Sequence, residues 1–464
     1  MGSNIYAFEL PTTGSLSFSD HISNGLDIYT TQISGATQAR ANLRAVLKES
    51  RHTDGDKDYL RLVKTLEEYL PYLYAIVNCL ESRDVMSTQE PVFSWRTTLS
   101  AQLFNNSPRL SLPSLSAELV FTLVTYGFAL SNLARLNVAA LGSYERERGI
   151  SDVERKAKDE KLGFAVAQFC KASGIFEHVS TVALSDAEQT PSWKSIRVRP
   201  PELSKEVTSA LSKLALAAAQ ALAIRKLLTK SSYDNTVASG PPFPASHPSP
   251  ALLAKLHLEA SALYASAESL LRIPASRKHD MEVTEPLLLF ARDGAALHGA
   301  LARKWLGADA GVHDALGVSV GFLAVAKRDL EALRDGNARP GGSGGTKEEM
   351  RDGRRERRER IAAEAEDAAR LLRQFKQIND SVSFLPVPSP AELQAAVPAG
   401  RLAVAIKAFA APLPAFGPGS VEYTRKHADT LDVEDRESSF TSDEQQSMRN
   451  PASKPTYAGA GSYF

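Results

Sequence analysis

The stretch that decides the fold reads Phe169-Cys170-Lys171-Ala172-Ser173-Gly174-Ile175-Phe176. Its central residues are small, and it lies within residues 152–183, where Gly163, Ala165 and Ala167 add further positions with little side-chain bulk. Small residues in a long helix are typical of close helix–helix approach, as in stacked helical-pair repeats. The stretch therefore predicts a long helix in the middle of a stacked helical fold.

Helical periodicity dominates the rest of the chain. Apolar residues at positions 63, 66, 70, 73, 77 and 80 are spaced three and four apart and form one stripe of a helix, which Pro71 should kink or divide. A strongly apolar helix is expected over residues 116–141, with Ser116 as its N-cap and Gly142 at its end. Further helices are expected over residues 203–230, 250–271, 284–307, 313–334 and 347–378. Strand signals are weak, and at most the first twenty residues could form a short hairpin, so we expect an all-α fold.

Loops and termini have a different composition. Residues 231–248 are rich in Gly and Pro and predict an exposed loop, and the Gly-rich residues 336–346 predict a flexible linker. Residues 382–414 are interrupted by prolines and should be extended, lying across the helices. From residue 417 onward polar residues dominate and no periodicity remains, which predicts a disordered tail over residues 417–464. One domain over residues 5–416 is therefore expected.

Composition excludes some classes of protein. The 464 residues include 54 Lys and Arg and 54 Asp and Glu, so the net charge of zero favours neither nucleic acid nor an anionic membrane as a partner. Cys79 and Cys170 lie in apolar contexts and predict buried thiols of a reduced compartment. No basic region followed by an apolar core begins the sequence, and the apolar run over residues 119–130 is shorter than the ~20 residues that span a bilayer. We expect a soluble, intracellular protein.

Motifs for catalysis or metal binding are not evident. The nine histidines are scattered singly and none has a metal-ligand spacing. Residues 341–347 (Gly-Gly-Ser-Gly-Gly-Thr-Lys) look like a phosphate-binding loop, but Thr346 and Lys347 are transposed relative to that motif and no strand precedes them. No nucleophile elbow or carboxylate pair is evident. The sequence therefore predicts a protein that is not an enzyme and needs no cofactor or metal.

A basic run follows the Gly-rich linker. Arginines alternate with Glu356 and Glu359 between Arg351 and Arg360. This pattern favours a solvated helix face with i,i+4 ion pairs over a site for membrane phosphates. Nucleic-acid binding is disfavoured because no aromatic stacking platform accompanies the arginines.

The helix that begins at Ser249 holds the candidate binding residues. Leu253 and the apolar residues that follow it at helical spacing should face the core. Leu252 and Leu256 belong to a neighbouring stripe roughly 80° away, bordered by Lys255. Two interpretations stay open: the leucines form an exposed docking patch, or the apolar arc is wide and buries both.

Three segments in this order resemble the Alix-type Bro domain, a helical scaffold that binds the membrane-remodelling ESCRT-III polymer. They are Phe93-Ser94-Trp95, the stretch over residues 169–176, and Asn379-Asp380. The start of the chain, with Leu10-Pro11-Thr12-Thr13 and then Leu16-Ser17-Phe18-Ser19, is similar to the PalC family of fungal pH-response regulators. The resemblance implies a single elongated, curved Bro domain with a TPR-like helical core.

The resemblance also implies a binding site. Ala251-Leu252-Leu253-Ala254-Lys255-Leu256 matches the Bro-domain segment whose two aliphatic residues bind an amphipathic helix from the tail of an ESCRT-III subunit. Leu252, Leu256 and Lys255 are therefore the candidate partner-binding residues, together with Ala223 on the preceding helix. The family has an aromatic residue where Ala223 stands, and its loss removes contact area. The tyrosine of Alix near Asn379-Asp380 has no counterpart here.

As a function, the resemblance implies a non-enzymatic adaptor of alkaline-pH signalling. Such an adaptor brings ESCRT-III together with the signalling components that process a pH-responsive transcription factor, and thereby promotes the proteolytic activation of that factor. It works in the cytoplasm and is recruited peripherally to the plasma membrane or endosome. One alternative is an endosomal sorting adaptor of the Alix or PalA type, which usually adds a V-shaped coiled domain and a Pro-rich tail not seen after Phe416. The other is an all-helical enzyme or lipid-binding protein, which would need a deep pocket with convergent polar groups.

Overall fold

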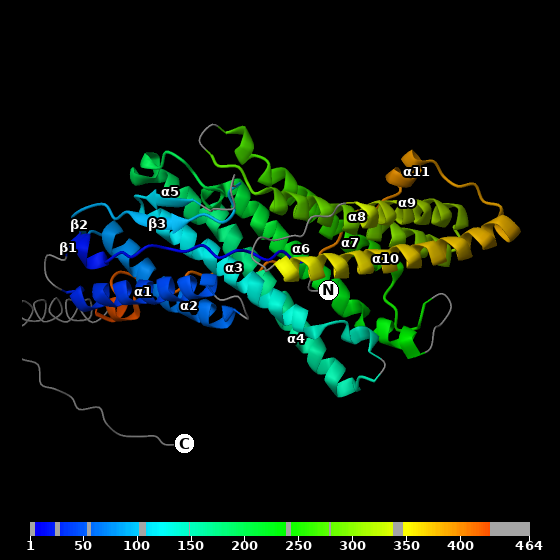
Figure 1. Ribbon diagram of the computed structural model, residues 1–464, viewed down its shortest axis with the longest axis horizontal. Coiled ribbons are helices and arrows are strands. Elements are labelled where there is room, and N and C mark those ends of the chain that lie inside the picture. The colour runs from blue at the N-terminus through cyan, green and yellow to red at the C-terminus, as the bar shows by residue number, and fades with distance from the viewer. Residues whose placement is uncertain are drawn as a thin grey trace, which may run out of the picture.

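A computed structural model describes residues 5–23, 28–52, 57–101, 108–147, 149–237, 243–277, 280–336 and 347–426. Within these residues long helices lie side by side in an elongated stack (Figure 1). Strands are few and short. The predicted all-α, elongated fold is confirmed.

Helices that follow one another along the chain pack against one another. The contacts run from α3 to α4, α6, α7, α8, α9 and α10 in turn, as in a helical-repeat protein, while α1 and α2 pair beside α3. Their bounds are α1 Thr30–His52, α2 Tyr59–Glu81, α3 Leu115–Leu141, α4 Asp152–His178, α5 Leu184–Gln189, α6 Lys205–Val237, α7 Pro250–Leu271, α8 Glu285–Val312, α9 Leu316–Asp335, α10 Lys347–Ile378 and α11 Pro390–Ala395.

Two small antiparallel sheets lie beside α1 to α3. β1 (Ile22–Ser23) pairs with β2 (Met86–Ser87), and β3 (Phe93–Arg96) pairs with β4 (Arg109–Leu112). The N-terminal segment runs along β3, where the backbone N–H of Arg96 donates to the carbonyl of Thr12 over 2.9 Å. Residues 5–20 pair with β3 rather than forming the possible hairpin with one another. The N–H of Gly14 likewise donates to the carbonyl of Ser94 over 2.8 Å.

A buried carboxylate ties this end of the fold together. Glu118 of α3 is fully buried and accepts hydrogen bonds from Trp95 Nε1 (2.6 Å), Arg40 Nε (2.8 Å) and Tyr69 Oη (3.0 Å). A buried charge is tolerated when it is paired and hydrogen-bonded in this way. The Phe-Ser-Trp segment is thereby joined to α1, α2 and α3 at a single side chain.

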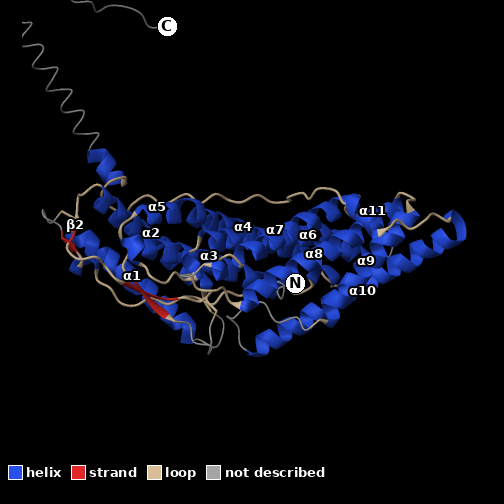
Figure 2. Ribbon diagram, turned by 90° about the horizontal axis from the view of Figure 1, so that it is seen from above, coloured by secondary structure: helices blue, strands red, loops and turns tan. Residues whose placement is uncertain are grey.

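An extended C-terminal segment, residues 396–416, runs along one face of the helices (Figure 2). The N–H of Lys407 donates to the carbonyl of Cys170 over 3.1 Å, and the N–H of Arg401 donates to the carbonyl of Lys255 over 3.0 Å. The predicted extended course across the helices is found over residues 396–414, but it is wrong for residues 390–395, where Ser389 caps the short helix α11. Gly174 lies against the backbone of this segment. Its small size does mark a close approach, as expected, but the neighbour is the extended segment and not another helix.

Several element boundaries differ from the expectations. α3 is capped by Ser114, whose hydroxyl accepts from the N–H of Ala117 over 3.3 Å, rather than by Ser116. α2 continues through Pro71 as one helix. α6 extends to Val237, so the loop predicted from residue 231 starts later; Tyr233 packs against the core and under Arg155 of α4, which continues the helix past the polar residues. Residues 238–242 and 337–346, the centres of the two predicted loops, lie outside the described residues.

Packing continues beyond Phe416. Ser420 is buried, and Asn78 Nδ2 donates to the carbonyl of Pro418 over 3.1 Å. Gly417 has a φ of +68° and approaches Cys79 so closely that a Cβ would overlap its sulfur. The predicted tail therefore does not begin at residue 417, because residues 417–420 are held against α2. Residues 427–464 lie outside the described residues.

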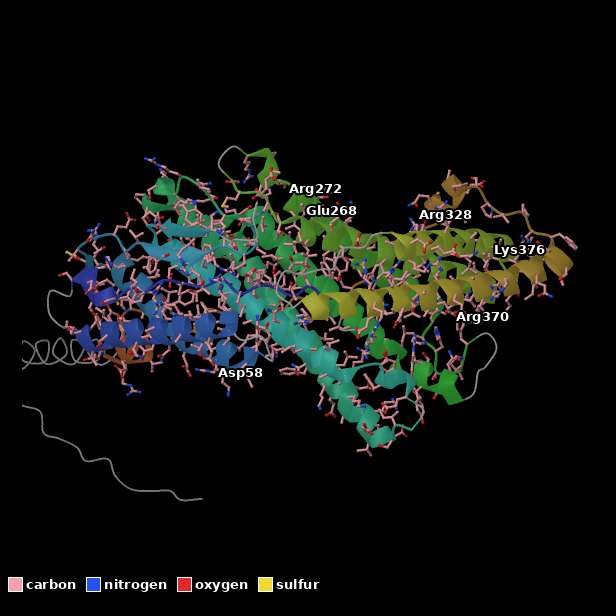
Figure 3. All side chains as sticks on the ribbon, in the orientation of Figure 1. Asp58, Glu268, Arg272, Arg328, Arg370 and Lys376 are labelled. Carbon is pink, nitrogen blue, oxygen red and sulfur yellow. The ribbon has the colours of Figure 1, made fainter. Side chains whose placement is uncertain are left out.

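Two of the described helices, α3 and α6, are long and apolar enough to span a membrane by length and composition alone. In each, 78% of the apolar window is buried inside the protein, as in the core helices of a globular fold. Many charged side chains lie on the outside of the stack, for example the Arg272–Glu268 pair at 2.6 Å (Figure 3).

Candidate partner-binding site

The structure separates the two leucines proposed from the sequence. Leu256 is only 2% exposed and belongs to an apolar cluster with Ile224 of α6, Trp305 of α8 and Phe375 of α10. Leu252 is half-buried at the edge of the same cluster. The expectation that both leucines lie at an exposed rim is therefore wrong for Leu256. Helices on several sides of α7 pack against it, so a wide part of its apolar surface is buried.

Lys255 and Ala223 retain accessible surface. Lys255 is exposed and Ala223 of α6 is half-buried. Their relative position is fixed by Gln220, whose Nε2 donates to the carbonyls of Leu256 (3.2 Å) and Arg401 (2.8 Å). Since α6 and α7 are antiparallel, Ala223 lies one turn along α6, near the level of Leu252. Three of the four candidate residues therefore reach the surface at one junction between α6 and α7.

Two further apolar side chains lie at this junction. Leu227 follows Ala223 by one turn of α6 and is 43% exposed, and Leu402 of the extended segment is 46% exposed. Leu402 lies between two anchors, since Arg401 bonds to Lys255 and the N–H of Ala403 donates to Gln220 Oε1 over 2.8 Å. We call Ala223, Leu227, Leu252 and Leu402 the apolar strip. Sequence reasoning missed Leu227, which helical spacing from Ala223 could have indicated, and Leu402, for which no sequence signal exists.

Basic side chains border the apolar strip. Lys226 and Lys230 of α6 are exposed, as is Lys255. Within the described residues none of these three lysines has a carboxylate within 4 Å. The strip therefore has three basic neighbours, while one carboxylate, that of Glu259, lies against Gly400 near Leu402. A helix with an apolar face flanked by acidic residues would complement this surface.

The described residues offer little for catalysis. Within them, no group of three or more His, Cys, Asp and Glu side chains could hold a metal ion. Cys79 and Cys170 are free and buried, in keeping with the sequence. Burial raises the pKa of the Cys79 thiol to about 12, which leaves it protonated and unreactive at neutral pH.

Two sequence interpretations change once the helices are packed. His257 and His298 are not isolated: their Nδ1 atoms lie 2.9 Å apart inside the protein. The basic run is not wholly a solvated face either, because Arg357 pairs with Asp293 at 3.2 Å and Arg360 lines a cavity. The side chains of residues 351–354 and the Gly-rich stretch over residues 341–346 lie outside the described residues.

Comparison with known proteins agrees with this architecture. The model of the BRO1-like domain family matches residues 12–422. The pH-response regulator protein palC of Cryptococcus neoformans var. neoformans serotype D (strain B-3501A) is 32% identical over 502 aligned residues, with 99% of each chain covered.

Solved structures share the fold at lower identity. The ALIX BRO1 CHMP4C complex matches 89% of this chain and 97% of its own, with 18% identity and a TM-score of 0.56. ALIX in complex with the SIVmac239 PYKEVTEDL late domain matches 94% of this chain with 16% identity and a TM-score of 0.60, and this chain spans 56% of that longer one. From the family match and the palC similarity together, the chain belongs to the BRO1-like domain family and, within it, to the palC pH-response regulators.

Proposed function

We propose that this protein is a non-enzymatic adaptor of fungal alkaline-pH signalling that binds the amphipathic tail helix of an ESCRT-III subunit. The observation that carries the proposal is the similarity to a palC regulator over 99% of the chain. The Bro-domain resemblance supplies the ESCRT-III partner, and a structural relative solved in complex with CHMP4C supports a partner of that kind. By bringing this partner to other signalling components, the adaptor would promote proteolytic activation of a pH-responsive transcription factor.

The apolar strip is the proposed docking surface. Leu252, Leu227 and Leu402 offer exposed or half-buried apolar area, and Lys255 lies beside them. A helix seated here would bury these side chains and bring its acidic flanks near the lysines, as in other helix-in-groove complexes. Leu256 would support the surface from below rather than contact the partner.

The absence of an aromatic residue at position 223 affects the strength of this contact. Aromatic side chains supply large contact areas at interfaces, and Ala223 supplies little. Leu227, one turn along α6, and Leu402, beside the residue that bonds to Gln220, offer exposed apolar area in place of the aromatic ring. We propose that the groove is reshaped around these two leucines.

Recruitment to membranes would be peripheral. The two apolar helices are largely buried in the stack, so contact with the plasma membrane or endosome would come through partners or through surface charge. Endosomal sorting is the alternative role for the same fold.

A direct binding measurement tests the proposal. A labelled peptide of the C-terminal helix of a fungal ESCRT-III subunit is titrated with the full chain, and fluorescence anisotropy is recorded. The titration is done at about 50 and about 300 mM salt, below and above physiological ionic strength. We expect saturable binding that weakens with salt. A scrambled peptide of the same composition is the control. Equal binding of both peptides, or no binding at either salt concentration, would refute the ESCRT-III contact.

A further inference from the structure

A cavity in which the centres of water molecules could occupy about 90 Å³ lies between α6, α7, α8 and α10. Its walls are mainly apolar and include Leu222, Leu228, Leu297, Leu301, Trp305 and Ile361. Arg225 of α6 also lines it, and helix geometry places Arg225 about 160° around α6 from Leu227. The cavity is therefore separate from the apolar strip.

Two guanidinium groups face this cavity from different helices. Arg225 is 1% exposed; its Nη2 donates to Glu145 Oε2 over 2.8 Å, but its Nε and Nη1 are buried without a hydrogen-bond partner in the described part of the chain. Arg360 of α10 is half-buried and forms no hydrogen bond or ion pair with any described residue. Buried donors without acceptors are unfavourable and uncommon in native proteins. The two such donors here, Nε and Nη1, belong to Arg225; because Arg360 lines the same cavity and has no ion pair with a described residue, the arrangement indicates a missing anionic acceptor.

The other cations near the cavity are already neutralised. Lys304 lies 2.8 Å from Glu364 and 2.5 Å from Asp367, and Arg357 pairs with Asp293. Glu364, the only carboxylate among the cavity-lining residues, is thus engaged by Lys304. Arg360 is left without a close counter-ion. Burial, and the positive charges of Arg225 and Arg357, lower the pKa of Arg360, while Glu364 acts in the opposite sense.

The histidine pair adds neutral polar groups to the same wall. With Nδ1 atoms 2.9 Å apart, one imidazole donates its Nδ1–H to the other. The donor then has an unprotonated Nε2 and the acceptor carries its proton on Nε2. No hydrogen bond to either Nε2 is formed within the described residues. His257 and His298 therefore offer the cavity one donor and one acceptor.

We propose that this cavity binds a small organic anion with an apolar chain, its acidic headgroup between Arg225 and Arg360 and its hydrocarbon against the leucines of α6 and α8. A carboxylate or phosphate head would satisfy the unpartnered guanidinium donors, because both groups accept paired hydrogen bonds from arginine. A mostly apolar pocket with a few convergent polar groups is the usual form of a small-molecule site. This ligand would be independent of the partner helix.

Calorimetric titration of the full chain tests the proposal. The probes are octanoate and octyl phosphate, which share one chain and differ in headgroup, with octan-1-ol as the uncharged probe. We expect both anions to bind one per chain and octan-1-ol to bind at least roughly tenfold more weakly. The tighter of the two anions identifies the headgroup as carboxylate or phosphate. Failure of both anions to bind, or equal binding of octan-1-ol, would overturn the proposal.

Variants locate the site. Arg360→Met removes the unpaired charge and keeps most of the side-chain length, so anion affinity should fall at least roughly tenfold, to the level of octan-1-ol. Ala221→Leu adds volume to a cavity-lining position of α6 and should abolish binding of all three probes. Arg358→Met, an exposed arginine on the same helix, is the matched control and should bind as the unaltered chain does. Unchanged anion binding in both Arg360→Met and Ala221→Leu would contradict the assignment to this cavity.

Discussion

Gly174 of α4 lies directly beneath the carbonyl group of Lys407, so closely that a Cβ at position 174 would overlap the carbonyl oxygen. The hydrogen bond from Lys407 N–H to the carbonyl of Cys170 holds the extended segment at this point. The glycine is thus the position on α4 at which the C-terminal segment can lie against helix backbone. The small-residue stretch of the sequence serves this contact.

Gly174→Ala should therefore destabilise the protein. The added methyl group meets backbone rather than a flexible side chain, so the segment must move, at a cost of about 1–3 kcal/mol in the free energy of unfolding. Gly163→Ala on the same helix is the control, because there a Cβ meets only the tip of Lys226 at 3.0 Å and alanine is the better helix former. Chemical denaturation measures both. Equal stability of the two variants would show that the segment is not held at Gly174.

Removing the buried carboxylate should be among the most damaging single changes. Glu118→Leu leaves Arg40 buried without its partner and removes acceptors from Trp95 and Tyr69, at a cost of about 3–5 kcal/mol. Adding Arg40→Met to Glu118→Leu should recover much of the loss, since no unpaired charge remains. Glu49→Leu, from the exposed Arg61 pair, should change stability by less than about 0.5 kcal/mol. A double variant no more stable than Glu118→Leu alone would contradict this account.

The apolar strip and the core beneath it should respond differently to charge. Leu256→Asp buries a carboxylate in the α6–α7–α8 cluster and should lower the free energy of unfolding by at least about 3 kcal/mol. Leu227→Asp and Leu402→Asp should change it by less than about 0.5 kcal/mol and weaken peptide binding more than tenfold. Unfolding curves and anisotropy on the same preparations measure both effects. Full binding by the two stable variants would remove the strip as the docking surface.

Truncation should distinguish the packed from the unpacked end of the chain. Ending the protein after Phe416 removes the contacts of Pro418 and Ser420 with α2. We expect Tm to fall by about 1–2 °C, the shift that a loss of about 1–2 kcal/mol produces in a chain of this length. Ending it after Lys426 keeps those contacts and removes a polar stretch without periodicity, so Tm should be unchanged. Scanning calorimetry of the three chains provides the comparison. Identical Tm values for all of them would place the boundary at Phe416 after all.

Acid should weaken the α7–α8 interface. Burial lowers the pKa of His257 to about 3 and that of His298 well below its ordinary value of 6.5. Below pH 6.5 the unfolded chain takes up protons that the folded protein does not, so stability falls as pH falls through this window, by up to about 1.4 kcal/mol per pH unit for each histidine. Above pH 6.5 the pair contributes no pH dependence.

The histidine pair can be isolated by mutation. Replacing both with leucine should flatten the stability profile between pH 6.5 and 4, measured by urea denaturation across that range. His313→Gln alters an exposed histidine and should leave the slope unchanged. An unaltered slope in the double variant would assign the acid sensitivity to other groups.

Much of the architecture could be predicted from local sequence. Apolar spacing located the long helices, Ser249-Pro250 marked the start of α7, and the small residues around Gly174 marked a place of close approach. These features follow from backbone geometry and side-chain volume, which neighbouring residues carry by themselves. The three segments that resemble the Alix-type Bro domain likewise indicated the family.

Only the tertiary structure decided which side chains are covered. Leu252 and Leu256 have the same residue type and lie one turn apart, yet Leu256 is buried because Ile224, Trp305 and Phe375 from three other helices close over it. Leu402 reaches the surface at the α6–α7 junction because its neighbours Arg401 and Ala403 form hydrogen bonds with residues about 150–180 positions away. The sequence by itself determined the helices and their apolar faces, because periodicity is local. The burial of Leu256, the contact between His257 and His298, and the position of Arg360 at the cavity depend on which helices pack together. Helix packing involves residues far apart in the sequence, so local patterns do not reveal it.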